Sequence, residues 1–507
     1  MRTENSLYSS ISSIIFNLLT VILGLANRKV LIDTLGVEYQ GISGLFTNIL
    51  VVLAIADAGV GNAIMYHLYK PVEENNLPLI RSLFRFYKSC YIKIGILILT
   101  AGLICIPVLP YIIMDYSLPY DIWFVYIWFL ADTVCSYFFM YKRAALIANQ
   151  KNYKVTFYET LYLITSKLTQ IIILILFKSF VIYLAVMLVF RVGENMLISR
   201  EAEKDNPEYW DRDAKYGDIS TELKADINRK VKGSLYGKLS QAVFNGTDNI
   251  LLSKFFGLSA VGVISNFQMI VSVLQGLCSS WSYSFVSSVG NLLVTSDNVD
   301  SYKVFKEIHL VTAYLLTVGV TGFACTSNEL IAWIFGNEYV ISTSIIYSMA
   351  ASFFVFNLHA PYDIFKSAAG IIYEDRFIPL IEALINLLTS IILLKIVGIP
   401  GIFWGTAISS LTVFCYSYPI YVNKGIFKQT IGKYLKRLMI TFLLPGISIA
   451  LATRFCGVIQ MQASIVSFIA KGIISVAVSS LVFWIGYAAW AEETKRLISR
   501  IKNILHR

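Results

Sequence analysis

Apolar runs of about 20 residues recur along the whole chain and are separated by short polar segments. A run of this length crosses a bilayer as one helix, because backbone polar groups in lipid must be bonded within their own segment. The pattern predicts an all-α integral membrane protein with fourteen transmembrane helices. Their expected positions are near residues 8–27, 41–66, 89–109, 121–147, 156–177, 180–199, 233–253, 261–290, 308–334, 342–369, 377–396, 401–422, 438–455 and 465–488.

The first part of the chain is repeated about 221 residues later. The segment Leu35–Ser43 reappears as Phe256–Ile264, and Glu159 matches Glu382 at an offset of 223. Each copy has six spans, and this even number makes the two copies parallel in the membrane. We predict an N-lobe of six spans over residues 1–200, a linker over 201–231, a C-lobe of six spans over 232–425, and two added spans with a basic tail over 426–507.

Charge distribution sets the expected orientation. Only 15% of the 507 residues are charged, against about 25% in soluble proteins. If the N-terminus is cytoplasmic, inner segments together with the adjoining span ends hold 31 Lys and Arg residues, and outer loops with their adjoining span ends hold 6. By the positive-inside rule both termini are therefore cytoplasmic. The net charge of +10 follows mainly from this topology, so a nucleic-acid partner is not indicated.

Two segments outside the spans are rich in charge. We expect residues 200–232 to form a solvated, partly helical connector between the two lobes. The tail Ala491–Arg507 has a basic amphipathic pattern that is typical of a helix lying on the membrane surface.

Polar stripes on the first and seventh spans are the first candidates for a site. Asn17 lies in the stripe of span 1, and the stripe of span 7 includes Lys238, Gln241, Asn245 and Asp248. Polar residues that faced lipid would be costly, so these faces contact each other or water. The alternative is ordinary hydrogen bonding between helices. A charged residue in span 7, flanked by amides on the same face, favours a water-filled cavity lined by spans 1, 2, 7 and 8.

Cations in or beside this cavity would suit an anionic substrate. Lys238 is the main candidate, Arg28 lies at the outer end of span 1, and Lys167 in span 5 is a further one. A diphosphate in a cleft of low dielectric constant is attracted more strongly than in water.

Three carboxylates within or near the apolar spans, Asp57, Asp132 and Asp248, are candidates for binding a coupling proton or Na⁺. The alternative for each is a structural role beside a neighbouring Lys or Arg. The segment Ala56–Gly61 contains two glycines that permit a bend or a close approach.

Other charged residues have simpler expected roles. Arg191 and Glu194 are three residues apart and predict a local ion pair. Glu159 and Glu382 begin equivalent helices, where capping or a salt bridge is expected. No nucleophile–base arrangement, metal-ligand spacing or phosphate loop is present in the sequence, so we predict neither an enzyme nor a metal site.

The chain resembles a known family. Two parallel six-span halves, two added spans, the Leu-Gly-x-x-x-x-Gly segment from Leu35 to Gly41, and the turn Ala148–Lys151 resemble the polysaccharide transport, or Wzx-type, flippases. These belong to the multidrug/oligosaccharidyl-lipid/polysaccharide (MOP) superfamily and have the fold of the MATE transporters. By position, the cavity cations of the family correspond to Arg28 and Lys238.

The resemblance implies a flippase that moves undecaprenyl-diphosphate-linked oligosaccharide from the inner to the outer leaflet by alternating access. The glycan would serve capsule, O-antigen or exopolysaccharide synthesis, and the location would be the bacterial cytoplasmic membrane. No cofactor is implied, although an H⁺ or Na⁺ gradient would drive transport. The implied partners are the lipid-linked substrate, membrane lipids, a polysaccharide polymerase and a chain-length regulator.

Two alternatives stay open. A cation-coupled small-molecule exporter of the same fold would need an aromatic, acidic cavity. A membrane glycan polymerase would need large external loops, whereas the longest outer loop here has about 13 residues.

Overall fold

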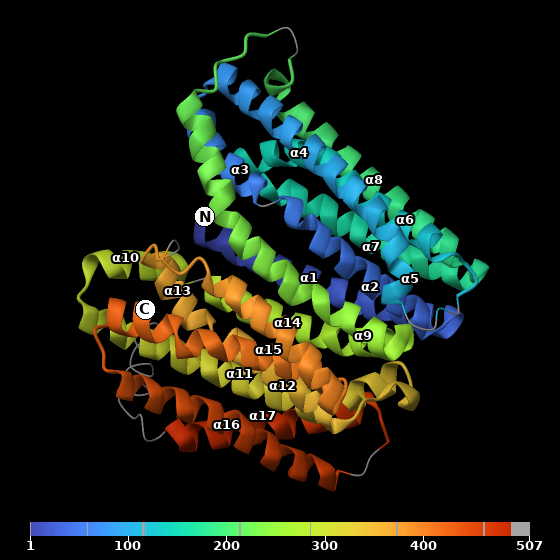
Figure 1. Ribbon diagram of the computed structural model, residues 1–507, viewed down its shortest axis with the longest axis vertical. Coiled ribbons are helices and arrows are strands. Elements are labelled where there is room, and N and C mark those ends of the chain that lie inside the picture. The colour runs from blue at the N-terminus through green and yellow to red at the C-terminus, as the bar shows by residue number, and fades with distance from the viewer. Residues whose placement is uncertain are drawn as a thin grey trace. The chain divides into compact units, whose positions relative to one another are not determined.

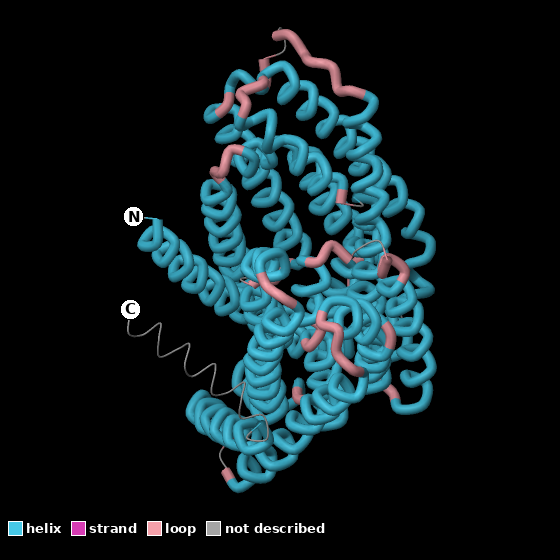
Figure 2. The backbone as a smooth tube through the Cα atoms, turned by 90° about the vertical axis from the view of Figure 1, so that its left-hand side faces the viewer, coloured by secondary structure: helices cyan, strands magenta, loops and turns pink. Residues whose placement is uncertain are grey.

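The computed structural model describes residues 2–487 except 58, 114, 115, 117, 212, 213, 284, 372, 373, 460 and 461. The side chains of residues 2–18 and of most residues between 233 and 245 also lie outside the described part. The predicted surface helix Ala491–Arg507 falls outside it as well. Within these limits the backbone consists of helices joined by short loops, with no strand (Figure 2).

The chain forms two compact units, which divide after Ser265. In the first unit, α6 packs against both α4 and α8, and α7 packs against α1 and α8 (Figure 1). Its helices are α1 (Arg2–Leu35), α2 (Val37–Leu53), η1 (Ala54–Asp57), α3 (Val60–Glu73), α4 (Leu77–Cys105), η2 (Ile106–Val108), α5 (Leu109–Ile112), α6 (Ile122–Ala148), α7 (Asn152–Phe177), α8 (Phe180–Asp205), η3 (Pro207–Tyr209) and the first part of α9 (Thr221–Tyr283).

The second unit contains the rest of α9 and the remaining helices. Here α15 packs against α14 and α12, while α11 packs against α12, α16 and α17. The helices are α10 (Val286–Thr295), α11 (Asn298–Ile334), η4 (Asn337–Tyr339), α12 (Thr343–Asn357), α13 (Ala360–Ala368), α14 (Ile378–Val397), α15 (Pro400–Cys415), the π-helix η5 (Tyr418–Ile426), α16 (Ile431–Val458) and α17 (Ile465–Tyr487).

Among the described residues, eleven helical segments are long and apolar enough to cross a membrane. The chain is therefore a multi-pass membrane protein, and the count of fourteen stays a prediction. The predicted spans 7 and 8 both overlap one segment, Gly246–Ser282, and α15 has only 16 residues.

The repeated glycines have the same unusual backbone conformation. Gly36 ends α1 with φ 113°, and Gly257 lies within α9 with φ 80°. Residues other than glycine rarely adopt these backbone angles. Each glycine turns the chain between two helices at the same place in the repeat, which confirms that the two copies are alike at this junction.

The two copies of this junction pack on each other inside the first unit. A Cβ atom on Gly41 would overlap the carbonyl oxygen of Leu258, and one on Gly262 would overlap that of Val37. These two contacts are equivalent at the offset of 221. Both glycines are therefore needed for the close approach of α2 to α9.

Part of the predicted connector packs against the start of α4. Arg81 Nε donates to the carbonyl oxygen of Glu208 at 2.7 Å, and the backbone N–H of Gly217 donates to Pro78 O at 2.9 Å. The rings of Phe84 and Trp210 lie 5.2 Å apart. The described residues of the connector are mostly exposed or half-buried and partly helical, as expected. The contacts with α4 were not expected, because they involve backbone groups and aromatic rings and do not follow from charge.

The added helices α16 and α17 pack against α11 in the second unit. Lys471 Nζ lies 2.5 Å from Glu329 Oε2, and both side chains are largely buried. Tyr314 and Ser480 share a hydrogen bond of 2.9 Å. The polar contacts give α17 a defined register on α11, which apolar packing alone does not supply.

Candidate functional site

A chain of ion pairs runs through the first unit and joins α6, α7 and α8. Arg191 Nε lies 3.4 Å from Asp132 Oδ1, and Arg191 Nη1 lies 3.1 Å from Glu194 Oε2. Arg143 Nη2 lies 3.0 Å from Glu194 Oε1, and Arg143 also pairs with Glu159. Three carboxylates thus alternate with two guanidinium groups.

Burial explains why these charges are linked. The side chain of Glu194 is 10% exposed and that of Asp132 is 16% exposed. Removing charges from water costs several kcal/mol each unless partners and hydrogen bonds compensate. The predicted pair of Arg191 with Glu194 is confirmed, and Glu159 makes the salt bridge that was one of its two expected roles.

A second polar group joins α1, α7 and α8. The hydroxyl of Tyr183 donates to Asn27 Oδ1 at 3.0 Å, and Asn27 Nδ2 donates to Gln170 Oε1 at 3.4 Å. Lys167 Nζ donates to the same amide oxygen at 3.2 Å. Asn27 and Gln170 are almost fully buried. This network fixes the direction of the Lys167 side chain.

Three cations come together around this network, and we call Arg28, Lys167 and Arg191 the cation cluster. Arg28 and Arg191 both lie close enough to repel the Lys167 ammonium, and Asp132 lies close enough to attract it. Arg28 Nη1 also donates to the carbonyl oxygen of Ser265 at 2.8 Å. Two carboxylates, Asp132 and Glu194, pair with Arg191, so three cations against two carboxylates leave an excess of positive charge where α1, α7 and α8 meet, as an anionic ligand requires.

The remaining predicted site residues are less well defined. Asn17 lies on α1, and Lys238, Gln241 and Asn245 lie on α9, but their side chains are outside the described part. Their roles stay predictions. Asp248 is described, and its Oδ1 atom is buried without a hydrogen-bond partner among the described residues.

Asp57 lies at a break in the second predicted span. The helix α2 ends at Leu53, η1 ends at Asp57, and α3 begins at Val60 after Gly59, which has φ 75°. The hydroxyl of Tyr91 donates to Asp57 Oδ1 at 3.0 Å. The bend that the two glycines predicted is confirmed.

The sequence reasoning missed Arg143, which joins two of the carboxylates. A signal for it existed: Arg143 and Lys366 are separated by 223 residues, the same offset as Glu159 and Glu382. The basic residue and the acidic residue therefore recur together in both copies.

The corresponding part of the second unit is different in character. The helices α12 and α15, both described throughout, carry no charged residue. Aromatic rings pack there instead, with Tyr362 and Tyr418 stacked at 4.6 Å and Phe414 at 5.2 Å from Tyr418. Lys366 pairs with Asp375 at 2.5 Å near the end of this region. The copies share a framework, but the linked charges of α6 and α8 belong to the first copy.

No protein-family model and no curated protein matches the sequence. Solved structures do match it over most of its length. The lipid II flippase MurJ in an inward closed conformation aligns with a TM-score of 0.65 and 13% identity, covering 94% of this chain and 100% of that one.

Two other matches are transporters of the MOP superfamily. An inward-facing multidrug-resistance MATE transporter aligns with a TM-score of 0.60 and 13% identity, covering 79% of this chain and 94% of that one. A transporter from Pyrococcus furiosus, described as having a binding pocket of reversed polarity, aligns with a TM-score of 0.53 and 14% identity, covering 83% of this chain and 95% of that one. The chain therefore has the fold of MOP-superfamily transporters.

Proposed function

We propose that the chain is a flippase that moves undecaprenyl-diphosphate-linked oligosaccharide from the inner to the outer leaflet of the bacterial cytoplasmic membrane. The observation that carries this proposal is the cation cluster of Arg28, Lys167 and Arg191 in a membrane protein with a transporter fold. Two unit charges 4 Å apart attract by about 4 kcal/mol at an effective dielectric constant of ~20. A diphosphate gains such attractions from Arg28 and Lys167 at this cluster, while Arg191 is already paired with Asp132 and Glu194.

The rest of the substrate follows from the membrane setting. The lipid tail stays in the bilayer while the diphosphate occupies the cation cluster, with Asn17, Lys238, Gln241 and Asn245 contributing further polar contacts. Alternating exposure of this site moves the head group between leaflets. The product would be used for capsule, O-antigen or exopolysaccharide synthesis, with a polymerase and a chain-length regulator as partners.

An H⁺ or Na⁺ gradient drives the cycle in this proposal. Asp132 faces Arg191, which already compensates its charge. Asp57 receives a hydrogen bond from a neutral tyrosine. Asp248 has a buried oxygen without a partner among the described residues, so it is the carboxylate that we assign to the coupling ion.

The test uses cells in which the gene is deleted and replaced by variants. Arg28→Ala combined with Lys238→Ala should abolish surface polysaccharide and cause lipid-linked oligosaccharide to accumulate inside the cell. Lys29→Ala is the matched control, because Lys29 pairs with Asp33 at an exposed position. Normal surface polysaccharide in the double variant would contradict the site assignment.

A cation-coupled exporter of small molecules is the second candidate. The alignment with a MATE transporter and the aromatic cluster of the second unit favour it. The cation cluster opposes it, because drugs exported by such proteins are commonly cationic and would be repelled. Gain of drug resistance on overexpression, with normal surface glycan after deletion, would decide for this candidate.

A further inference from the structure

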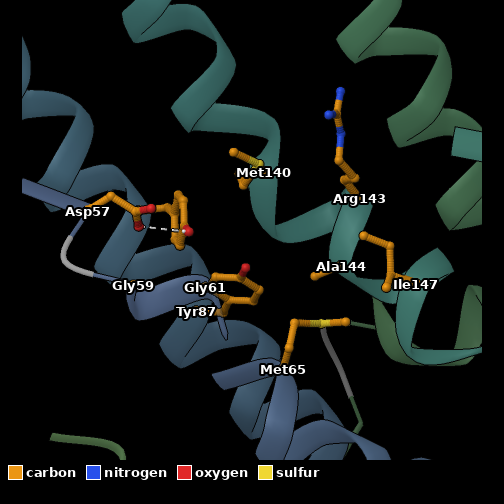
Figure 3. Close-up of a pocket in the computed structure, with 10 residues that line it drawn as sticks. Asp57, Gly59, Gly61, Met65, Tyr87, Met140, Arg143, Ala144 and Ile147 are labelled. Carbon is orange, nitrogen blue, oxygen red and sulfur yellow. Dashed lines mark hydrogen bonds between the residues drawn. The ribbon is translucent and has the colours of Figure 1, made fainter. Parts of the chain in front are cut away.

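A cavity of about 210 Å³ lies beside the break in the second predicted span, between α3, α4 and α6 (Figure 3). Asp57 and Tyr87 lie on one side of it, and residues of α6 lie on the other. The lining residues are Asp57, Gly59, Gly61, Met65, Tyr87, Tyr91, Met140, Arg143, Ala144 and Ile147. Neither the cation cluster nor the predicted polar stripes include these residues, so the cavity is a separate feature.

Glycine at position 61 leaves the space that the tyrosine hydroxyls occupy. A Cβ atom on Gly61 would lie 2.5 Å from the hydroxyl oxygen of Tyr91 and 3.0 Å from that of Tyr87. The Tyr91 hydroxyl can then donate to Asp57 Oδ1 at 3.0 Å. The break in the helix and the small residue together place a carboxylate and two hydroxyls at one wall of the cavity.

The cavity does not present a net positive charge. Arg143 is the only cation among its lining residues, and both Glu159 and Glu194 pair with that guanidinium. Asp57 adds a negative charge on the opposite wall. A diphosphate would therefore be disfavoured here, whereas the cation cluster holds Arg28 and Lys167 in addition to the paired Arg191.

The volume of the cavity distinguishes between a bare cation and a larger neutral group as its ligand. One water occupies roughly 10–15 Å³ on this measure, so 210 Å³ is far more than a bare cation needs. The lining combines a carboxylate, two hydroxyls and one guanidinium group with the apolar side chains of Met65, Met140 and Ile147. This mixture suits a neutral group that has both hydroxyls and C–H faces.

We propose that this cavity is a subsite for one sugar ring of the lipid-linked oligosaccharide. This inference rests on the proposed function and adds a second point of recognition to it. The Asp57 carboxylate accepts hydrogen bonds from sugar hydroxyls, and the Tyr91 hydroxyl holds the carboxylate in place. The guanidinium of Arg143 donates to sugar oxygens, while the methionine side chains cover the C–H faces.

The experiment compares two lipids on the purified full-length chain in nanodiscs. One probe is undecaprenyl diphosphate without sugar, and the other is undecaprenyl-diphosphate-linked oligosaccharide isolated from cells in which the gene is deleted. Asp57→Asn should weaken binding of the sugar-bearing lipid by about tenfold or more, because hydrogen bonds to charged groups are the stronger ones. Binding of the bare diphosphate lipid should be unchanged.

Tyr91→Phe should weaken binding of the sugar-bearing lipid by a smaller factor. The Asp57 carboxylate remains in this variant but loses the hydrogen bond that holds it in place. Asp33→Asn is the matched control, because Asp33 is exposed and lies outside the cavity. Thermal unfolding of each variant shows that the chain is still folded before binding is measured.

Equal affinity of Asp57→Asn and wild type for the sugar-bearing lipid would overturn the subsite, as would an equal loss for both lipids. A wild-type affinity for the sugar-bearing lipid that depends on Na⁺, with that dependence lost in Asp57→Asn, would make the cavity a cation site and would also overturn it. If wild type binds neither lipid, the proposed function fails and the subsite fails with it.

Discussion

Gly41→Ala tests the close contact between the two copies of the repeat. The added methyl group would overlap the carbonyl oxygen of Leu258 and lie 3.2 Å from the backbone nitrogen of Gly262. Backbone atoms cannot rotate away as a side chain can, so α2 and α9 must separate. Overpacking of this kind costs about 3 kcal/mol at the upper end of its range.

The net effect is smaller than the overlap alone suggests. Alanine in place of glycine within a helix favours folding by about 1 kcal/mol, so Gly41→Ala should destabilise the chain by about 2 kcal/mol. Gly44→Ala, one turn further along α2, is the matched control. Its methyl group would meet Asn249 Nδ2 at 3.6 Å, an ordinary contact, and the variant should be as stable as wild type or more so.

The measurement is the free energy of unfolding in detergent, followed by helix content during titration with sodium dodecyl sulfate. Gly262→Ala should behave like Gly41→Ala, because the contact is repeated at the equivalent position. If Gly41→Ala were as stable as Gly44→Ala, the close approach of α2 to α9 would be refuted.

Three further predictions concern buried charges and pH. Arg143→Ala leaves Glu194 without one of its two partners, so the free energy of unfolding should fall by about 3–5 kcal/mol; recovery of stability in Arg143→Met combined with Glu194→Gln would confirm the cause. Lys471→Ala should destabilise the docking of α17 by a similar amount, because Glu329 loses its cation; protease resistance of the C-terminal part reports it, and an unchanged digest would count against the pair. Burial, and then the nearby charge of Lys230, lower the pKa of His67 below its ordinary value of 6.5, and Asp226 opposes both effects. The unfolded chain therefore binds this proton more readily, so stability should fall as the pH drops below 6.5; His67→Gln should remove that part of the pH dependence, and an identical pH profile in the variant would contradict it.

The sequence predicted the elements that depend on local pattern. Apolar runs indicated the spans, and the repeat indicated that Gly36 and Gly257 occupy equivalent junctions, as their shared positive φ confirms. The packing of the linker on α4 was not predicted. This packing depends on backbone hydrogen bonds and on the contact between the rings of Phe84 and Trp210. Neither contact can be predicted from the number of charged residues in the linker.

The site was predictable only where its contacts are local. Arg191 and Glu194 are three residues apart on one helix, so spacing alone predicted their ion pair. Arg143 and Glu194 are 51 residues apart, and their contact depends on how α6 packs against α8. A periodic pattern places a residue on a helix face but does not say which other helix covers that face. The contact of Arg143 with Glu194 and the cavity at Asp57 therefore emerged only from the structure.

The most direct test of the central claim is the transfer of lipid-linked oligosaccharide across a bilayer that contains only this protein. Proteoliposomes carrying the lipid in the inner leaflet, with an H⁺ or Na⁺ gradient imposed across the membrane, are monitored through the sugar that becomes accessible to a lectin outside. The account predicts that wild type exposes the sugar, that Lys29→Ala does so at the same rate, and that Arg28→Ala combined with Lys167→Ala slows exposure by at least about tenfold, equivalent to ~1.4 kcal/mol. A wild-type rate no faster than that of protein-free liposomes would contradict the account.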